Sequence, residues 1–84
     1  VATMYSKGIS LNVLSKAYGL PGLRIGWIAA QDRQLLKQIE KVKQYTSLCN
    51  SGPAEIIGLI ALRNKELILQ RNNEIVRKNL NLLN

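Results

Sequence analysis

The chain has 84 residues, 46% of them hydrophobic, and carries 12 Lys and Arg against 5 Asp and Glu, a formal net charge of +7. This length allows one modest core, and the hydrophobic content argues against a disordered chain. One cysteine, Cys49, and no histidine exclude an internal disulfide, a zinc site and any serine or cysteine catalysis that relies on a histidine base.

The positive charges are spread along the chain rather than clustered. Lysines and arginines alternate with Glu40, Glu66 and Glu74 in two predicted helices. Solvated helix faces explain this pattern, and a small basic module that binds nucleic acid or phosphate groups is the alternative. No apolar run approaches the roughly 18–20 residues of a membrane span, and no signal peptide is visible. We therefore expect a cytoplasmic chain with no membrane contact and without nucleic acid as its main partner.

The first predicted elements are two short strands. Residues 9–14 (ISLNVL) are rich in branched side chains that alternate imperfectly with polar ones, which favours a strand. A glycine-rich turn follows at residues 19–22. Residues 23–30 (LRIGWIAA) are almost continuously apolar and predict a strand that is buried on both faces. The pattern therefore predicts a strand–loop–strand unit over residues 9–30.

Three helices are expected next, over about residues 32–46, 53–63 and 65–83. Asp32 is placed to cap the first helix, and Pro53 suits the first turn of the second. The first and third helices each carry one apolar stripe. The second is apolar on almost every side, so it is either buried all round or has partners outside this chain.

These elements predict the α/β class, but two short strands do not make an independent sheet, because three or more are normally needed. We therefore interpret residues 1–84 as part of a larger α/β domain. Self-association that supplies the missing cover is the alternative, in which the apolar helices form an assembly segment between protomers.

The loop between the predicted strands carries the clearest chemistry. Ser15 and Lys16 follow the first strand, and ligands of open α/β sheets gather at the carboxyl ends of strands. Arg24 in an apolar strand would be costly without an anion, and no acid lies within seven positions of it. A phosphate or carboxylate suits its planar guanidinium.

A lysine amine that loses its proton, through desolvation or a neighbouring cation, can attack a carbonyl. Lys16, near Arg24 and among apolar residues, meets that requirement. Spacing alone leaves open that Lys16 is a surface lysine and that Arg24 pairs with an acid distant in sequence.

Residues 15–27 (SKAYGLPGLRIGW) resemble the cofactor-lysine signature of class I/II aminotransferases, which are fold-type-I pyridoxal-phosphate enzymes. The resemblance runs from about Lys7 to the end of the chain. It implies a partial large domain in which Lys16 holds pyridoxal phosphate as an internal aldimine and then transfers the substrate proton. Ser15 and Arg24 would bind the phosphate. It also implies a homodimer that transfers an amino group between an amino acid, with aspartate among the candidates, and a 2-oxo acid.

Other residues that the family uses do not occur in this sequence. The family has an Asp-x-x-Tyr segment before the lysine and an arginine near its end that binds the substrate carboxylate. We therefore expect the isolated chain to be inactive. The resemblance leaves a transaminase and a related lyase or synthase of the same fold both open.

Overall fold

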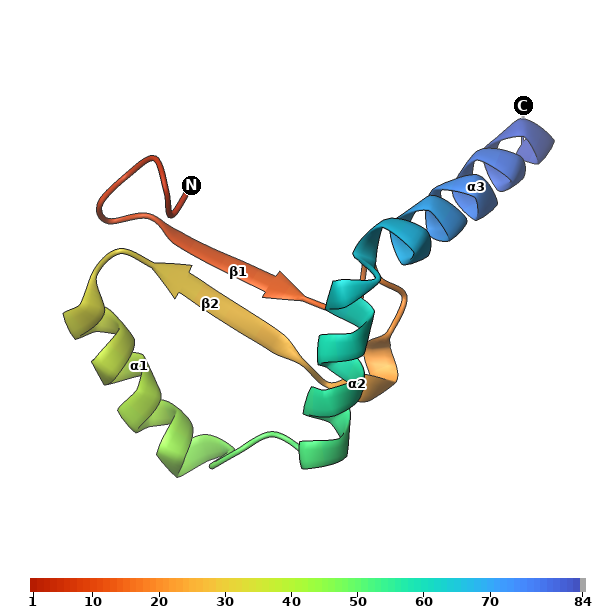
Figure 1. Ribbon diagram of the computed structural model, residues 1–84. Helices are drawn as coiled ribbons and strands as arrows, with labels where there is room; N and C mark the ends of the chain where they lie inside the picture. Colours follow the sequence, from red (N-terminus) through yellow and green to blue (C-terminus); the bar gives the residue numbers. More distant parts are fainter. Residues whose placement is uncertain (84) are drawn as a thin grey trace.

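The computed structural model describes residues 1–83 and has two strands followed by three helices (Figure 1). This is the order that the sequence predicts, and it belongs to the α/β class. The elements are β1 (Ile9–Val13), a 3₁₀ turn (Pro21–Leu23), β2 (Gly26–Ala30), α1 (Arg33–Thr46), α2 (Gly52–Arg63) and α3 (Lys65–Leu83).

The two strands form an antiparallel pair in which Val13 lies opposite Gly26. The carboxyl end of β1 therefore meets the amino end of β2, and the connecting loop of residues 14–25 leaves and re-enters the sheet at one edge. Gly26 has a steric role there, because a Cβ at this position would lie 2.8 Å from the carbonyl oxygen of Asn12. The close backbone approach at this glycine is the pairing with β1 itself.

The second strand differs from its prediction in length and in burial. It begins at Gly26 rather than at residue 23, because Leu23 ends the 3₁₀ turn and Arg24 has a left-handed backbone with φ of 54°. The expected burial on both faces was wrong for residues 1–83, since Trp27 and Ile28 remain 37% and 39% exposed. The sheet has one other strand, and α1 is the helix that packs on β2.

Helix α1 begins where the sequence places a cap. One carboxylate oxygen of Asp32, Oδ1, accepts hydrogen bonds from the backbone N–H groups of Gln34 at 2.9 Å and Leu35 at 3.0 Å. These bonds satisfy two of the amide donors that a helix start leaves without partners. The half-buried residues of α1 include Leu35, Leu36 and Ile39, which follow the predicted apolar stripe.

Helix α2 contacts the rest of the chain through its smallest residues. Gly58 and Ala61 are its buried positions, whereas Ile56 and Ile60 are 64% and 55% exposed. Of the two alternatives for this apolar helix, the structure of residues 1–83 agrees with the second, in which its large side chains are left for partners beyond these residues. Asn64 then separates α2 from α3, and its side chain donates to the Ile60 carbonyl at 2.9 Å.

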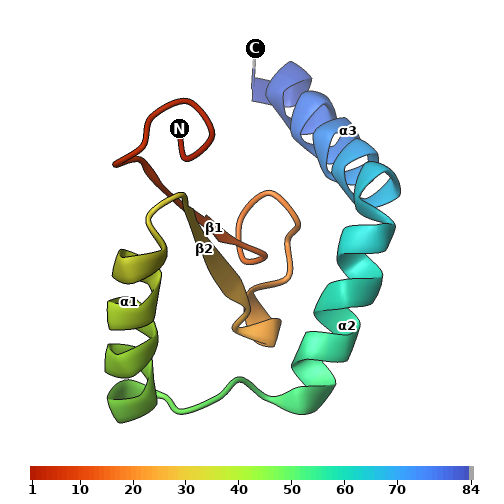
Figure 2. The ribbon, with the colours of Figure 1, turned by 60° about the vertical axis from the view of Figure 1, so that its left-hand side comes forward.

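The elements form an open arch, with α1 on one side of the strand pair and α2 and α3 on the other (Figure 2). The radius of gyration is 16.1 Å, well above the roughly 12 Å expected for a compact chain of this length. Among the described residues, the buried apolar side chains are those of Ala2, Leu14 and Ala61. Within residues 1–83, no helix combines the length and apolar character that crossing a bilayer requires.

Candidate functional site

The loop of residues 14–25 carries all three candidate residues and folds back on itself. Its ends continue the strand pairing, because the Leu14 amide donates to the Ile25 carbonyl at 3.0 Å. The Leu20 amide then donates to the Leu14 carbonyl at 3.0 Å, which closes a smaller lobe. Ser15 and Lys16 lie on this lobe, while Arg24 lies beyond it.

The lobe turns tightly just after Lys16. The Gly19 amide donates to the Lys16 carbonyl at 2.9 Å, and Gly19 itself has φ of 65°. That backbone conformation is open to glycine and costly for most other residues. Gly19 is therefore needed for the tight turn that directly follows Lys16.

The start of the lobe is fixed by packing against α2. Leu14 is fully buried, and a Cβ built on Gly58 would lie 3.2 Å from the Leu14 Cδ1 atom and 3.7 Å from the Ile25 side chain. A glycine at position 58 thus allows the α2 backbone to approach the loop closely. Our sequence reasoning missed this role, although a single glycine inside an apolar helix is a known signal of close packing.

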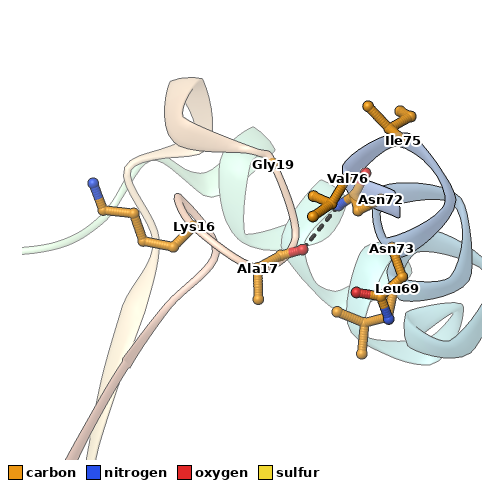
Figure 3. Close-up of a pocket in the computed structure, with 8 residues that line it drawn as sticks. All are labelled: Lys16, Ala17, Gly19, Leu69, Asn72, Asn73, Ile75 and Val76. Atoms are coloured by element: carbon orange, nitrogen blue, oxygen red, sulfur yellow. Dashed lines mark hydrogen bonds between the residues drawn. The ribbon is translucent and has the colours of Figure 1, made fainter. Parts of the chain in front are cut away.

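The far side of the lobe is held by α3. The Asn72 side-chain nitrogen Nδ2 donates to the Ala17 carbonyl at 2.8 Å, between residues 55 positions apart in the chain. Figure 3 shows this bond at a pocket of about 360 Å³ that the lobe and α3 line together. Our sequence reasoning also missed Asn72, because a polar residue on a solvated helix has no periodic signal.

Lys16 and Ser15 occupy different environments on the lobe. Ser15 is half-buried, whereas Lys16 is exposed. In Figure 3 the Lys16 amine points away from α3, although its residue borders the pocket. Residues 1–83 therefore leave the amine accessible and do not supply the apolar surroundings that the sequence suggested for it.

The position of Arg24 corrects a sequence expectation. Its residue is exposed and precedes β2, so it does not bring a charge into an apolar strand. The penalty for an unpaired buried charge therefore does not apply to it. Its Nη1 atom donates to the Pro21 carbonyl at 3.1 Å, and the fork of the guanidinium retains other N–H donors for an anion.

The chemistry of this donor set fits a phosphorylated carbonyl compound. A hydroxyl, an amine and a guanidinium lie on one loop, and residues 1–31 contain no carboxylate that would compete for them. Hydroxyl and guanidinium groups bind phosphate oxygens, and an amine can bond a carbonyl carbon. These residues thus fit a cofactor that has both a phosphate and an aldehyde.

Comparisons with known proteins agree with this chemistry. The family model for aminotransferase class I and II matches residues 2–83. A capreomycidine synthase from Streptomyces vinaceus is 36% identical over 62 residues, which are 73% of this chain and 15% of that protein. The crystal structure of a PLP-dependent aminotransferase from Streptococcus suis 89-1591 superposes with a TM-score of 0.87 at 40% identity, over 94% of this chain and 21% of that one. The chain thus spans less than a quarter of either protein.

Proposed function

The chain belongs to the class I and II aminotransferase family, and we propose that residues 1–84 are the lysine-bearing part of the large domain of a pyridoxal-phosphate-dependent aminotransferase. The observation that carries this proposal is the loop itself, which places Ser15 and Lys16 on a closed lobe and Arg24 on the return path, away from any acid in sequence. The longer polypeptide that would contain this segment is called the parent enzyme below.

Each candidate residue then has a defined role. Arg24 and Ser15 bind the phosphate of pyridoxal phosphate through charge-assisted and neutral hydrogen bonds. Lys16 would hold the cofactor through its Nζ atom at the aldehyde carbon, and its amine would carry the proton that leaves the substrate α-carbon to the cofactor. The cofactor supplies the electron sink when bound. Desolvation of the Lys16 amine must come from residues beyond this segment, because Lys16 is exposed here.

The finer features of the proposal concern substrate and assembly. The parent enzyme transfers an amino group between a small or acidic amino acid, aspartate among them, and a 2-oxo acid, and acts as a cytoplasmic homodimer. We expect the isolated chain to be inactive, because among residues 1–83 Lys16 and Arg24 are exposed and the buried apolar core consists of three residues. Measurable turnover by the purified segment would contradict this last point.

Labelling tests the role of Lys16 in the parent enzyme. Addition of pyridoxal phosphate should give a visible absorbance band that borohydride abolishes, and peptide mapping should find the reduced label on Lys16. The Lys16→Met variant should lose the label and at least about a thousandfold in turnover, within the range for a lost general base. Lys65→Met, at the start of α3, is the matched control. A label on another lysine would refute the assignment.

A synthase is the second candidate, and one observation favours it: the capreomycidine synthase is 36% identical over most of this chain. Both candidates use Lys16 in the same way and differ in product. Incubation of the parent enzyme with an amino acid and a 2-oxo acid distinguishes them. A transaminase forms a new amino acid from the 2-oxo acid, while a synthase of this fold converts its amino acid without amino transfer.

A further inference from the structure

We propose that Asn72 is a positioning residue for Lys16, acting through the backbone of the loop rather than on the cofactor or the substrate. This inference rests on the proposed function. Asn72 lies on α3, and its Nδ2 atom donates to the Ala17 carbonyl at 2.8 Å (Figure 3). It ties the residue next to the lysine to a helix that begins about fifty positions later in the chain.

Two consecutive backbone carbonyls, those of Lys16 and Ala17, accept hydrogen bonds. The Lys16 carbonyl accepts from the Gly19 amide at 2.9 Å, and the Ala17 carbonyl accepts from Asn72. Together these bonds define the peptide planes that follow Lys16, and therefore the direction in which its side chain leaves the loop. Because catalysis depends on the placement of the reacting amine to about 1 Å, a loosened peptide plane costs turnover more than it costs folding.

The contact is built for an amide at position 72. The Oδ1 atom of Asn72 accepts from the Arg71 guanidinium at 3.4 Å, which leaves Nδ2 to face the loop. A Cβ on Gly19 would lie 3.4 Å from the same Nδ2 atom. The turn glycine thus lies against the asparagine side chain. An aspartate would have the same shape but would place a carboxylate oxygen against the Ala17 carbonyl.

Two substitutions and one control test this role in the parent enzyme. Asn72→Ala removes the donor, Asn72→Asp keeps the size and removes the N–H group, and Asn73→Ala is the control. Alanine is a better helix former than asparagine, so α3 is retained in both alanine variants. Asn73 is adjacent to Asn72 and borders the same pocket.

The first measurement is hydrogen–deuterium exchange of residues 15–20 in the apoprotein, which does not depend on bound cofactor or on activity. Loss of one hydrogen bond should raise exchange by about fivefold in both Asn72 variants, with no change in Asn73→Ala. The second is steady-state kinetics, in which both Asn72 variants should lose roughly tenfold in kcat with little change in KM. A purely structural role would lower the amount of folded enzyme and leave kcat per active site unchanged.

Wild-type exchange or wild-type kcat in either Asn72 variant would overturn the assignment. The same experiment separates this inference from the proposed function. If borohydride does not label Lys16 in the wild type, the proposed function fails, and the exchange data still report whether Asn72 holds the loop. If Lys16 is labelled and the variants match the wild type, the role of Asn72 alone fails.

Discussion

The two arms of the loop between the strands are held in different ways. The first arm, residues 14–19, depends on α2, against which Leu14 is buried, and on α3, through Asn72. The polar groups of the second arm, residues 20–25, form hydrogen bonds with residues that are much nearer in the sequence. The backbone amide and the Nη1 atom of Arg24 both donate to the Pro21 carbonyl, at 3.3 and 3.1 Å.

This difference separates the two chemical functions of the loop. Under the proposed function, the amine of Lys16 has to meet a reacting carbon, and its arm contacts two helices that come later in the chain. Under the same proposal, Arg24 neutralises a phosphate, and this role tolerates some looseness because charge attraction is less directional than bond formation. Both arms pack on α2, the second through the 3₁₀ turn and Ile25, but the long-range side-chain hydrogen bond, from Asn72, goes to the arm that carries Lys16.

Truncation of Leu14 should have the largest effect, because it breaks the packed end of the first arm. Leu14 is fully buried even among residues 1–83, so Leu14→Ala in the parent enzyme should cost about 2–5 kcal/mol of stability. It should also reduce labelling of Lys16, which lies two positions later. Thermal unfolding measures the loss of stability, and borohydride reduction followed by peptide mapping measures the labelling of Lys16.

The control for Leu14→Ala is a swap that conserves volume. Leu14→Met keeps the side chain apolar and of similar size, and such changes usually cost less than about 1.5 kcal/mol. If Leu14→Ala and Leu14→Met lose equal stability, the shape of the side chain at position 14, rather than its buried volume, holds the arm. A loss under 1 kcal/mol for alanine would contradict the anchoring role.

Arg24 allows the second arm to be tested without disturbing the backbone. Its φ of 54° suits glycine, so Arg24→Gly should leave the melting temperature of the apoprotein unchanged. A hydrogen bond to a charged group is worth about 1.5–3 kcal/mol, so affinity for pyridoxal phosphate should fall about ten- to hundredfold.

Two further comparisons isolate the guanidinium. Arg24→Lys keeps the positive charge but lacks the planar fork of the guanidinium. Its affinity for pyridoxal phosphate should lie between those of the wild type and Arg24→Gly. Affinity for pyridoxal, which has no phosphate, should be the same in all three proteins. If Arg24→Gly weakens pyridoxal and pyridoxal phosphate equally, Arg24 does not bind the phosphate.

Local signals predicted most of the fold. Asp32 and Pro53 are placed by capping rules that act within a few residues, and both lie where those rules put them. The start of β2 was wrong because the apolar run includes Leu23, which the 3₁₀ turn uses instead. An apolar pattern reports which residues avoid water and does not show where a turn ends and a strand begins.

Burial was the harder property to predict. The sequence indicates that Ile28 and Ile60 belong in a core, yet both are exposed among residues 1–83. The apolar pattern and the resemblance together led to the expectation of a larger domain, and the solved aminotransferase, of which this chain covers 21%, has that additional length. The pattern alone does not say which segments provide the cover.

The candidate site was predicted in part, for a related physical reason. Ser15, Lys16 and Arg24 belong to one short motif, but the sequence placed Ser15 and Lys16 on the loop and Arg24 in the strand that follows it, whereas β2 begins at Gly26. Gly58 and Asn72 support that motif from separate helices. Their roles come from tertiary contacts, and a single sequence carries little information about which distant residues meet.

The smallest expected effects come from two glycine substitutions that should differ in sign. Among residues 1–83, a Cβ at Gly22 meets nothing within 4 Å, so Gly22→Ala should stabilise the apoprotein by about 0.4–1 kcal/mol through the entropy of the unfolded chain. Gly58→Ala gains up to about 1 kcal/mol of helix propensity, but its Cβ would lie 3.2 Å from Leu14 Cδ1. Because Leu14 is fully buried and has little room to shift, the net change should be a loss.

The contact between Gly58 and Leu14 can also be tested by combining the two substitutions. Leu14→Ala removes the Cδ1 atom that the new Cβ would meet, so Gly58→Ala should stabilise the helix once Leu14 is shortened. The double variant should therefore lose less stability than the sum of the two single losses, by at least about 0.5 kcal/mol, as residues in contact usually do. Additive losses in thermal unfolding would show that α2 does not hold the first arm through this contact.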